Sequence, residues 1–283
     1  MKTMRNVKNV LLSGLMFFCG SCQTNELSTV CEGMATTDVT VSDAELDSII
    51  VLAQNGYADG YHALAIRYRD GKGVPQSNLN ALFVHTLYTR LNTANGCNHE
   101  DVFDESHPYY PLAVMFNSPD DSALFGEMIE KMETACPMEF EAFKTVADYG
   151  KTDASVIIHR LKELENEGSE MSVLLCAYVY YASGDMKNFI SFFNSRADEY
   201  PMLHAVLGGH YECQYWGSDD PADLDKALEH YGKADAAAML FSKYANRLYQ
   251  LRDNLGQTGK LPLLDEKEMA RLKRLATVFQ PTE

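Results

Sequence analysis

The sequence predicts an all-α protein in which helical hairpins stack into a repeat solenoid. In most segments apolar residues recur every three or four positions, as they do on the buried face of a helix. Glycine and proline mostly lie between these segments. No run of β-branched residues alternates with polar ones between hairpin turns, so we expect no β-strand.

The first predicted hairpin follows a short leading helix. Ser42 and Glu45 form a capping-box pattern, and the helix that they open is expected to end at Gly56. A second helix then has small or apolar residues at intervals of four, and a third begins at Ser77. The residues that separate these two helices are Gly71, Gly73, Val74 and Pro75. We therefore predict two antiparallel helices joined by a short turn.

This hairpin resembles a Sel-one-like repeat, a relative of the tetratricopeptide repeat. The residues that fill the family pattern are Gly60, Leu64, Ala65, Tyr68, Gly71, Gly73, Val74, Ser77 and Ala81. The resemblance implies that small residues allow two helices to approach closely, and that each hairpin buries its apolar face against the next. It also implies a curved array whose first helices line an inner binding surface.

A second copy of the pattern is predicted at residues 204–237. Its first helix contains Leu207, Gly208 and Tyr211, and Gly208 is interpreted as a helix-packing position rather than part of an anion-binding turn. The turn is longer than in the first copy and is expected to contain Tyr215 and Trp216. Two further sets repeat the first-helix spacing: Ser172, Cys176, Ala177 and Tyr180, and Ala236, Leu240 and Tyr244.

Four other segments have helical periodicity and complete the predicted array. They are 119–132, 137–147, 153–167 and 265–279. The third has Val156, Ile157, Leu161 and Leu164 on its predicted apolar face, and the last is expected to cap the solenoid. The remainder of 92–153 is divergent.

The first 21 residues have the pattern of a bacterial lipoprotein signal peptide. Basic residues precede an apolar run that is too short to span a bilayer. Gly20 and Ser21 then precede Cys22, as in a lipoprotein cleavage box. The resemblance implies that Cys22 is acylated, that 22–41 is a tether and that 42–283 is the helical repeat domain. Because no acidic residue follows Cys22 directly, it also points to the outer membrane, with the periplasmic and the outer face both open.

The charge of the chain limits its partners. Asp and Glu number 40 against 24 Lys and Arg, which gives a formal charge of −16. Such a surface repels phosphate backbones and anionic headgroups, so we expect no nucleic-acid partner and membrane contact through the lipid anchor only. A protein partner, basic rather than acidic, is easier to accommodate.

No enzyme motif is present. The sequence lacks G-x-S-x-G, H-E-x-x-H and G-x-x-x-x-G-K-[ST], and we expect neither catalysis nor a cofactor. The densest polar cluster, CNHEDVFDESH at 97–107, matches no metal-ligand spacing and is interpreted as a solvated acidic loop, so no metal is expected. Five cysteines follow the anchor: Cys31, Cys97, Cys136, Cys176 and Cys213. This odd number leaves at least one unpaired, and Cys176 is expected to be a buried, inert thiol.

The leading hypothesis for function is a lipid-anchored, non-enzymatic protein–protein interaction scaffold of the cell envelope. The alternatives are a toxin-neutralising immunity or inhibitor lipoprotein, and an envelope hydrolase that acts on β-lactam or peptidoglycan. The candidate partner-binding residues are Arg67, His210, Tyr215 and Trp216, since aromatic and arginine side chains dominate protein interfaces. His204 and Gln214 are also expected on the inner face.

We predict that Cys22→Ser releases the protein from membranes while leaving it folded, because the anchor is a covalent lipid and the helical domain begins after a tether. Fractionation of cells that express the wild type or the variant measures this. Retention of the folded variant in the membrane fraction would contradict the lipoprotein interpretation.

Overall fold

A computed structural model of the chain describes residues 46–93, 102–117 and 122–277. Within these ranges there are thirteen α-helices and no β-strand, so the all-α prediction is confirmed for them. The helices are α2 (Leu46–Gln54), α3 (Ala58–Asp70), α4 (Asn78–Thr93), α5 (Tyr110–Asn117), α6 (Ser122–Ala135), α7 (Pro137–Ala147), α8 (Ala154–Glu167), α9 (Met171–Ala182), α10 (Met186–Arg196), α11 (Met202–Ser218), α12 (Pro221–Ala236), α13 (Ser242–Gln257) and α14 (Glu266–Thr277). The cleavage site, the tether and residues 94–101 lie outside the described residues.

A capping side chain begins the second helix of several hairpins, namely α4, α8, α10 and α12. Asp153, Asp185 and Asp220 cap α8, α10 and α12 by accepting a hydrogen bond from a backbone N–H two or three residues later. The hydroxyl of Ser77 does the same at the start of α4. These caps satisfy N–H groups that have no partner inside the helix. The shared position of the cap gives the fold its repeat-like character.

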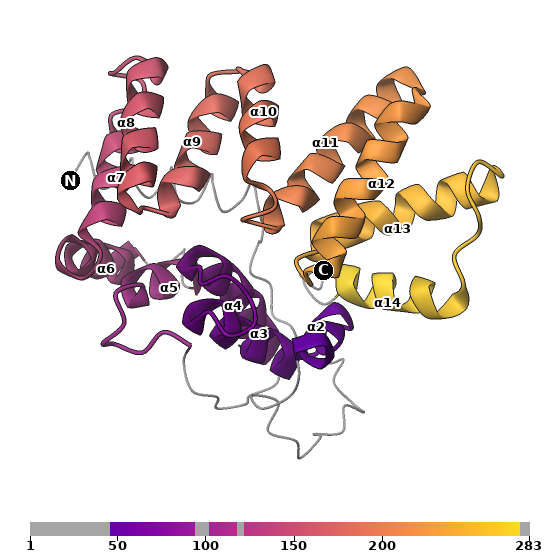
Figure 1. The fold of residues 1–283 in the computed structure, drawn as a ribbon, viewed down its shortest axis with the longest axis horizontal. Helices are drawn as coiled ribbons and strands as arrows, with labels where there is room; N and C mark the ends of the chain where they lie inside the picture. Colours follow the sequence, from indigo (N-terminus) through magenta and orange to yellow (C-terminus); the bar gives the residue numbers. More distant parts are fainter. Residues whose placement is uncertain (1–45, 94–101, 118–121, 278–283) are drawn as a thin grey trace.

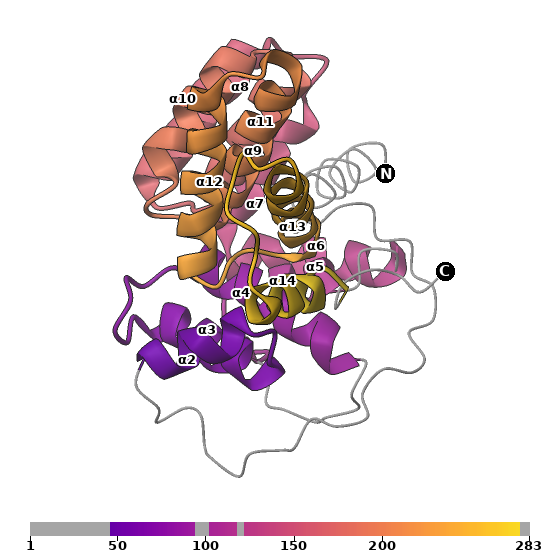
Figure 2. The same cartoon turned by 90° about the vertical axis from the view of Figure 1, so that its right-hand side faces the viewer.

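The helices form two layers. Figure 1 shows α7 to α12 standing side by side above α3, α4, α5 and α6, and Figure 2 shows the same separation from the side. The lower ends of the upright hairpins meet α4, which is buried at every position from Leu79 to Tyr88. Phe83 packs edge-on against Phe241 with ring centroids 4.9 Å apart, and the Asn80 amide donates to the Glu199 carbonyl at 2.9 Å. Helix α4 is therefore the centre of the core.

The start of α4 is tied to the start of α9 by a carboxylate. Glu170 accepts hydrogen bonds from the Ser77 hydroxyl at 2.7 Å and from the backbone N–H groups of Asn78 and Leu79 at 3.1 and 2.7 Å. A negative charge at this position also interacts favourably with the positive end of the helix dipole. One side chain thereby joins elements more than ninety residues apart in the chain.

A second carboxylate makes the same kind of contact at the start of α9. Glu139 of α7 is buried, and it accepts hydrogen bonds from the hydroxyls of Tyr109 and Ser169. It also accepts from the backbone N–H groups of Glu170 and Met171, both at 3.2 Å. Burial raises the pKa of Glu139, although these hydrogen bonds act in the opposite direction. The two carboxylates thus connect α7 to α9 and α9 to α4.

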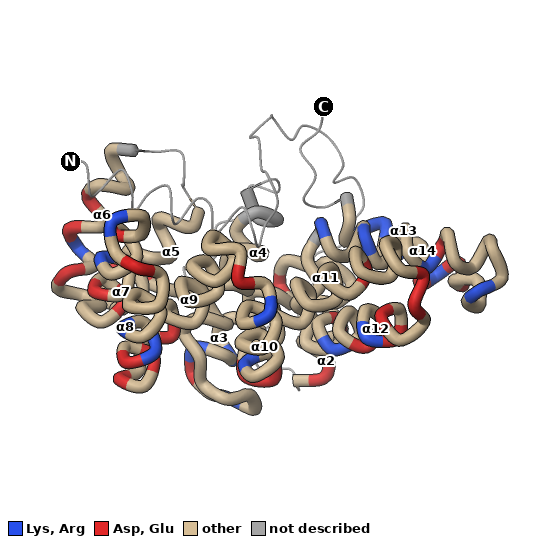
Figure 3. The backbone as a smooth tube through the Cα atoms, turned by 90° about the horizontal axis from the view of Figure 1, so that it is seen from above, with Lys and Arg blue, Asp and Glu red and all other residues tan. Residues whose placement is uncertain are grey.

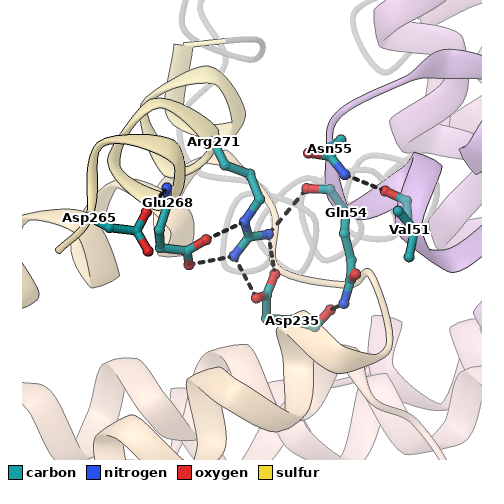
Figure 4. A network of polar contacts seen from close by, with 7 residues as sticks. All are labelled: Val51, Gln54, Asn55, Asp235, Asp265, Glu268 and Arg271. Atoms are coloured by element: carbon teal, nitrogen blue, oxygen red, sulfur yellow. Dashed lines mark hydrogen bonds and ion pairs between the residues drawn. The ribbon is translucent and has the colours of Figure 1, made fainter.

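The last helix returns to the first described one. Arg271 of α14 donates to both carboxylate oxygens of Asp235 at 2.8 and 2.6 Å and to the carbonyl oxygen of Gln54 at 3.2 Å (Figure 4). The Gln54 amide in turn donates to the Asp235 carbonyl at 2.7 Å, and Glu268 accepts from the same guanidinium. The chain therefore closes on itself, with α2, α12 and α14 joined at one point.

The core confirms much of the predicted register. Leu64, Tyr68 and Leu207 are buried, as are all four residues of the weaker match in α9, and Gly208 and Gly209 of α11 face Tyr231 and Tyr244. Several details were wrong. Val156 is 56% exposed, and Ala236, Leu240 and Tyr244 do not share a helix because α12 ends at Ala236. Helices α5 and α10 were not predicted at all.

The close helix contacts require particular glycines. We predict that Gly60→Ala lowers the free energy of unfolding by about 1–3 kcal/mol, because the added Cβ would lie 2.4 Å from the backbone nitrogen of Ala53. The matched control is Gly126→Ala in α6, where nothing lies within 4 Å and alanine should stabilise the helix by up to about 1 kcal/mol. Urea unfolding of the two variants measures both changes. Equal effects would show that α2 and α3 are not closely packed.

Candidate functional site

Helix α11 holds three of the four predicted binding residues, but not in the predicted turn. The helix continues to Ser218 and ends where Asp219 adopts a left-handed φ of 55°. Trp216 is 52% exposed, as expected of a binding residue. Tyr215 is only 2% exposed, and its hydroxyl accepts a hydrogen bond from Lys260 at 3.1 Å. The expectation that Tyr215 is exposed is wrong, because one more helical turn points it into the core.

The four predicted residues do not form one surface. Arg67 lies on α3, in the lower layer, whereas α11 belongs to the upper layer (Figures 1 and 2). His210 is half-buried, and burial lowers its pKa. His204, which was expected on an open face, is 5% exposed and packs against α12. Gln214 is exposed.

A buried carboxylate organises the side of α11 that faces α13. Glu212 is 7% exposed and accepts hydrogen bonds from the Tyr231 hydroxyl at 2.6 Å and from Nε of Arg247 at 2.8 Å. Nη2 of Arg247 also donates to the Gly209 carbonyl at 2.9 Å and to the Cys213 sulfur at 3.0 Å. Charge-assisted bonds of this kind are stronger than neutral ones, so the cluster fixes α11, α12 and α13 relative to one another.

This cluster also holds Trp216 in place. The indole Nε1–H donates to Glu212 at 3.3 Å, and the ring lies 5.2 Å from that of Tyr215. The polar atom of the tryptophan is therefore satisfied within the protein, while about half of the side chain faces solvent. An exposed aromatic ring that is already fixed loses little conformational entropy when it binds.

Acidic residues surround the tip of the α11–α12 hairpin, which follows Trp216. Asp219, Asp220, Asp223 and Asp225 follow Trp216 within ten residues. Two of them are in ion pairs, Asp219 with Lys260 at 2.7 Å and Asp223 with Lys226 at 3.7 Å. In Figure 3 both red and blue segments lie on α12, whereas the tubes of α9 and α11 are mostly tan. The tip of the α11–α12 hairpin thus combines a fixed aromatic ring with an excess of carboxylates.

A chain of three polar side chains lies on the α12 side of α11. Nδ1 of His204 is 2.9 Å from Nδ1 of His230, and Nε2 of His204 is 3.3 Å from Asp198. The Tyr211 ring stacks on the His230 ring, with centroids 5.5 Å apart and an interplanar angle of 6°. Nζ of Lys226 lies 5.0 Å from the centroid of the Tyr211 ring. No spacing in the sequence indicates this chain, because His204 and His230 lie on different helices.

The geometry of the histidine pair fits a hydrogen bond rather than a metal. The ring centroids are 5.1 Å apart, which brings the two Nδ1 atoms together head-on between the rings. A zinc ion lies about 2.0–2.1 Å from each imidazole nitrogen, so this arrangement leaves no room for one. Elsewhere in the described ranges, no three His, Cys, Asp or Glu side chains are grouped to hold a metal ion.

The cysteines within the described residues are free thiols. Cys136 and Cys176 are buried, and burial raises the pKa of each to about 12. The buried state predicted for Cys176 is therefore confirmed, and at neutral pH both thiols are protonated and unreactive. Cys213 is exposed, next to Arg247. Cys31 and Cys97 lie outside the described residues.

Comparison with known proteins identifies no relative. No family model matches the chain, and neither a curated protein nor a solved structure matches it. In the ranges that the structure describes, no helix is both long and apolar enough to cross a membrane.

We predict that Glu212→Ala lowers the free energy of unfolding by about 1–3 kcal/mol, since it leaves Arg247 and Tyr231 without their shared acceptor. The control is Glu141→Ala, which removes an exposed ion pair with Lys144 and should change stability by less than about 1 kcal/mol. Urea unfolding of the two variants measures these changes, and the addition of Arg247→Ala and of the Glu212→Ala/Arg247→Ala double variant completes the cycle that gives the coupling energy. Additive changes in the free energy of unfolding would show that the contact between Glu212 and Arg247 does not stabilise the fold.

Proposed function

We propose that this chain is a non-enzymatic scaffold that binds another protein through Trp216 and the tip of the α11–α12 hairpin. The observation that carries the proposal is that Trp216 is both half-exposed and fixed, through Glu212, to the core. Tryptophan is the residue type most enriched among those that dominate binding energy, and a fixed ring gives a partner a ready contact.

The charge around Trp216 favours a basic partner. The four aspartates of the hairpin tip exceed the nearby cations, and the chain as a whole carries a charge of −16. Complementary charge accelerates association and rejects acidic proteins more than it adds affinity. The scaffold would therefore select a protein whose contact surface contains lysine or arginine around an apolar pocket for the indole.

The repeated hairpins support a further part of the proposal, that the fold is a Sel-one-like array. The close contacts at Gly60 and Gly208, and the caps at the starts of α8, α10 and α12, agree with that family pattern. The closure at Arg271 gives this array a compact form. We also propose that acylated Cys22 holds it in the bacterial outer membrane, a proposal that rests on the N-terminal sequence alone.

A toxin-neutralising role is the second candidate, and the acidic hairpin tip is what favours it. Many inhibitors bind a basic surface of the enzyme that they block, and strong charge complementarity suits such a pair. The two candidates differ in outcome. An inhibitor abolishes the activity of its partner at a 1:1 ratio, whereas a scaffold leaves it active.

The proposal predicts that Trp216→Ala weakens partner binding at least tenfold without a change in thermal midpoint, because the ring is a binding contact with little core packing. The partner would be identified by photo-crosslinking in envelope extracts from the exposed position 214, which leaves Trp216 in place, and its affinity would then be measured by calorimetry at low and raised salt. The matched control is Tyr181→Ala, which removes an equally exposed aromatic ring from α9. Wild-type affinity of the Trp216→Ala variant, or equal loss in both variants, would exclude Trp216 as the docking site.

A further inference from the structure

The chain from Asp198 through His204 to His230 connects the loop between α10 and α11 to both helices of the α11–α12 hairpin, here called the docking hairpin. Its links are the 3.3 Å contact between Asp198 and Nε2 of His204, and the 2.9 Å contact between the two Nδ1 atoms. His204 and His230 are 5% and 9% exposed. Both rings thus lie inside the contact between α11 and α12.

The number of protons on the pair decides whether this contact is attractive. A hydrogen bond between two Nδ1 atoms needs one proton in the bridge, with one ring as donor and the other as acceptor. With two fully protonated rings, both Nδ1 atoms carry a proton, no acceptor remains, and two positive charges face each other. The contact then becomes repulsive, in a place where water cannot easily screen it.

The charged groups around the pair do not compensate fully for a second proton. Asp198, in the loop between α10 and α11, favours protonation, but its side chain is 93% exposed and solvent screens it. On α12, Glu229 is paired with Lys233 at 2.8 Å, and Lys233 itself opposes protonation of both histidines. Lys226 lies over Tyr211, which covers His230 from α11. No buried carboxylate touches the pair within the described residues.

We propose that the Asp198–His204–His230 chain is a pH-operated lock, which holds α11 against α12 at neutral pH and releases the docking hairpin on acidification. The effect on partner binding rests on the function proposed above. The lock itself does not, because it concerns only contacts within this chain.

The direction of the response follows from burial. Desolvation lowers the pKa of both histidines, to about 4 for His230 against an ordinary value of 6.5. The unfolded or opened state therefore binds protons more readily than the closed one. The stability that the neutral pair contributes is fully present above pH 6.5 and is lost as the pH falls toward 4.

The chain contains its own reporter of this change. Trp216 is the single tryptophan of the sequence and lies on α11, so its fluorescence reports the environment of that helix. The experiment is a titration of the full chain from pH 7.5 to 4, followed by tryptophan fluorescence and, for global unfolding, by far-ultraviolet circular dichroism. Wild type is compared with His230→Asn, which keeps an amide near the position of Nδ1 but does not titrate.

Two control variants separate the lock from other histidines. His159→Asn removes an exposed histidine of α8, and His85→Asn removes a buried one of α4 whose pKa is also lowered to about 4. We expect wild type and both controls to show a fluorescence transition between pH 6.5 and 4 while helicity is retained, and His230→Asn to lose it. A wild-type signal that changes only with global unfolding, or a transition that persists in His230→Asn, would overturn the lock.

Two further measurements complete the test. If His230→Asn does not fold at pH 7.5, nuclear magnetic resonance of the wild-type imidazoles decides instead, and independent titration of both rings near pH 6.5 would overturn the proposal. The partner affinity of the wild type should be at least tenfold lower at pH 5 than at pH 7.5. The affinity of His230→Asn should not show this fall. A fluorescence transition without any partner binding at pH 7.5 would contradict the proposed function and leave the lock intact.

Discussion

The hydrogen bonds that Glu170 accepts at the start of α4 hold the two layers of helices together. Every helix leaves N–H groups unpaired at its first turn, and burying that turn without an acceptor is costly. The start of α4 is buried under the upright hairpins, so an acceptor has to come from one of them. Glu170, at the start of α9, accepts from the first N–H groups of α4. Glu139 of α7 does the same for the first N–H groups of α9. Because these bonds fix where the hairpins rest on α4, they also fix where α11 lies.

Local features of the sequence predicted local structure well. The turn glycines, the prolines and the periodic apolar residues indicated most helices, and the glycines of α11 were correctly assigned to helix packing. Helix α5 was missed because it follows an acidic loop and contains a proline at its second position. The end of α11 was placed too early because no Gly-x-Gly pair marks it, and this error made buried Tyr215 look exposed.

The tertiary contacts could not be predicted from spacing. Glu139, Glu170 and Arg271 look like ordinary surface charges in an acidic sequence, and only the fold shows that each bonds to a distant element. The histidine chain is a similar case, since His204 and His230 have no motif in common. A resemblance to a stacked repeat predicts contacts between neighbouring hairpins, but it does not predict contacts between the first and last helices, such as the one at Arg271.

The central position of α4 has a consequence for how the protein loses its structure. In an extended array each hairpin touches only its neighbours, and the ends can fray while the middle persists. Here α4 contacts residues from widely separated hairpins, and α14 is fastened to α2. Displacement of one hairpin therefore uncovers part of a helix on which the others rest. Denaturation should be cooperative across the whole array, so that partially unfolded forms are scarce. A destabilising change at either end should then lower the free energy of unfolding of the whole molecule.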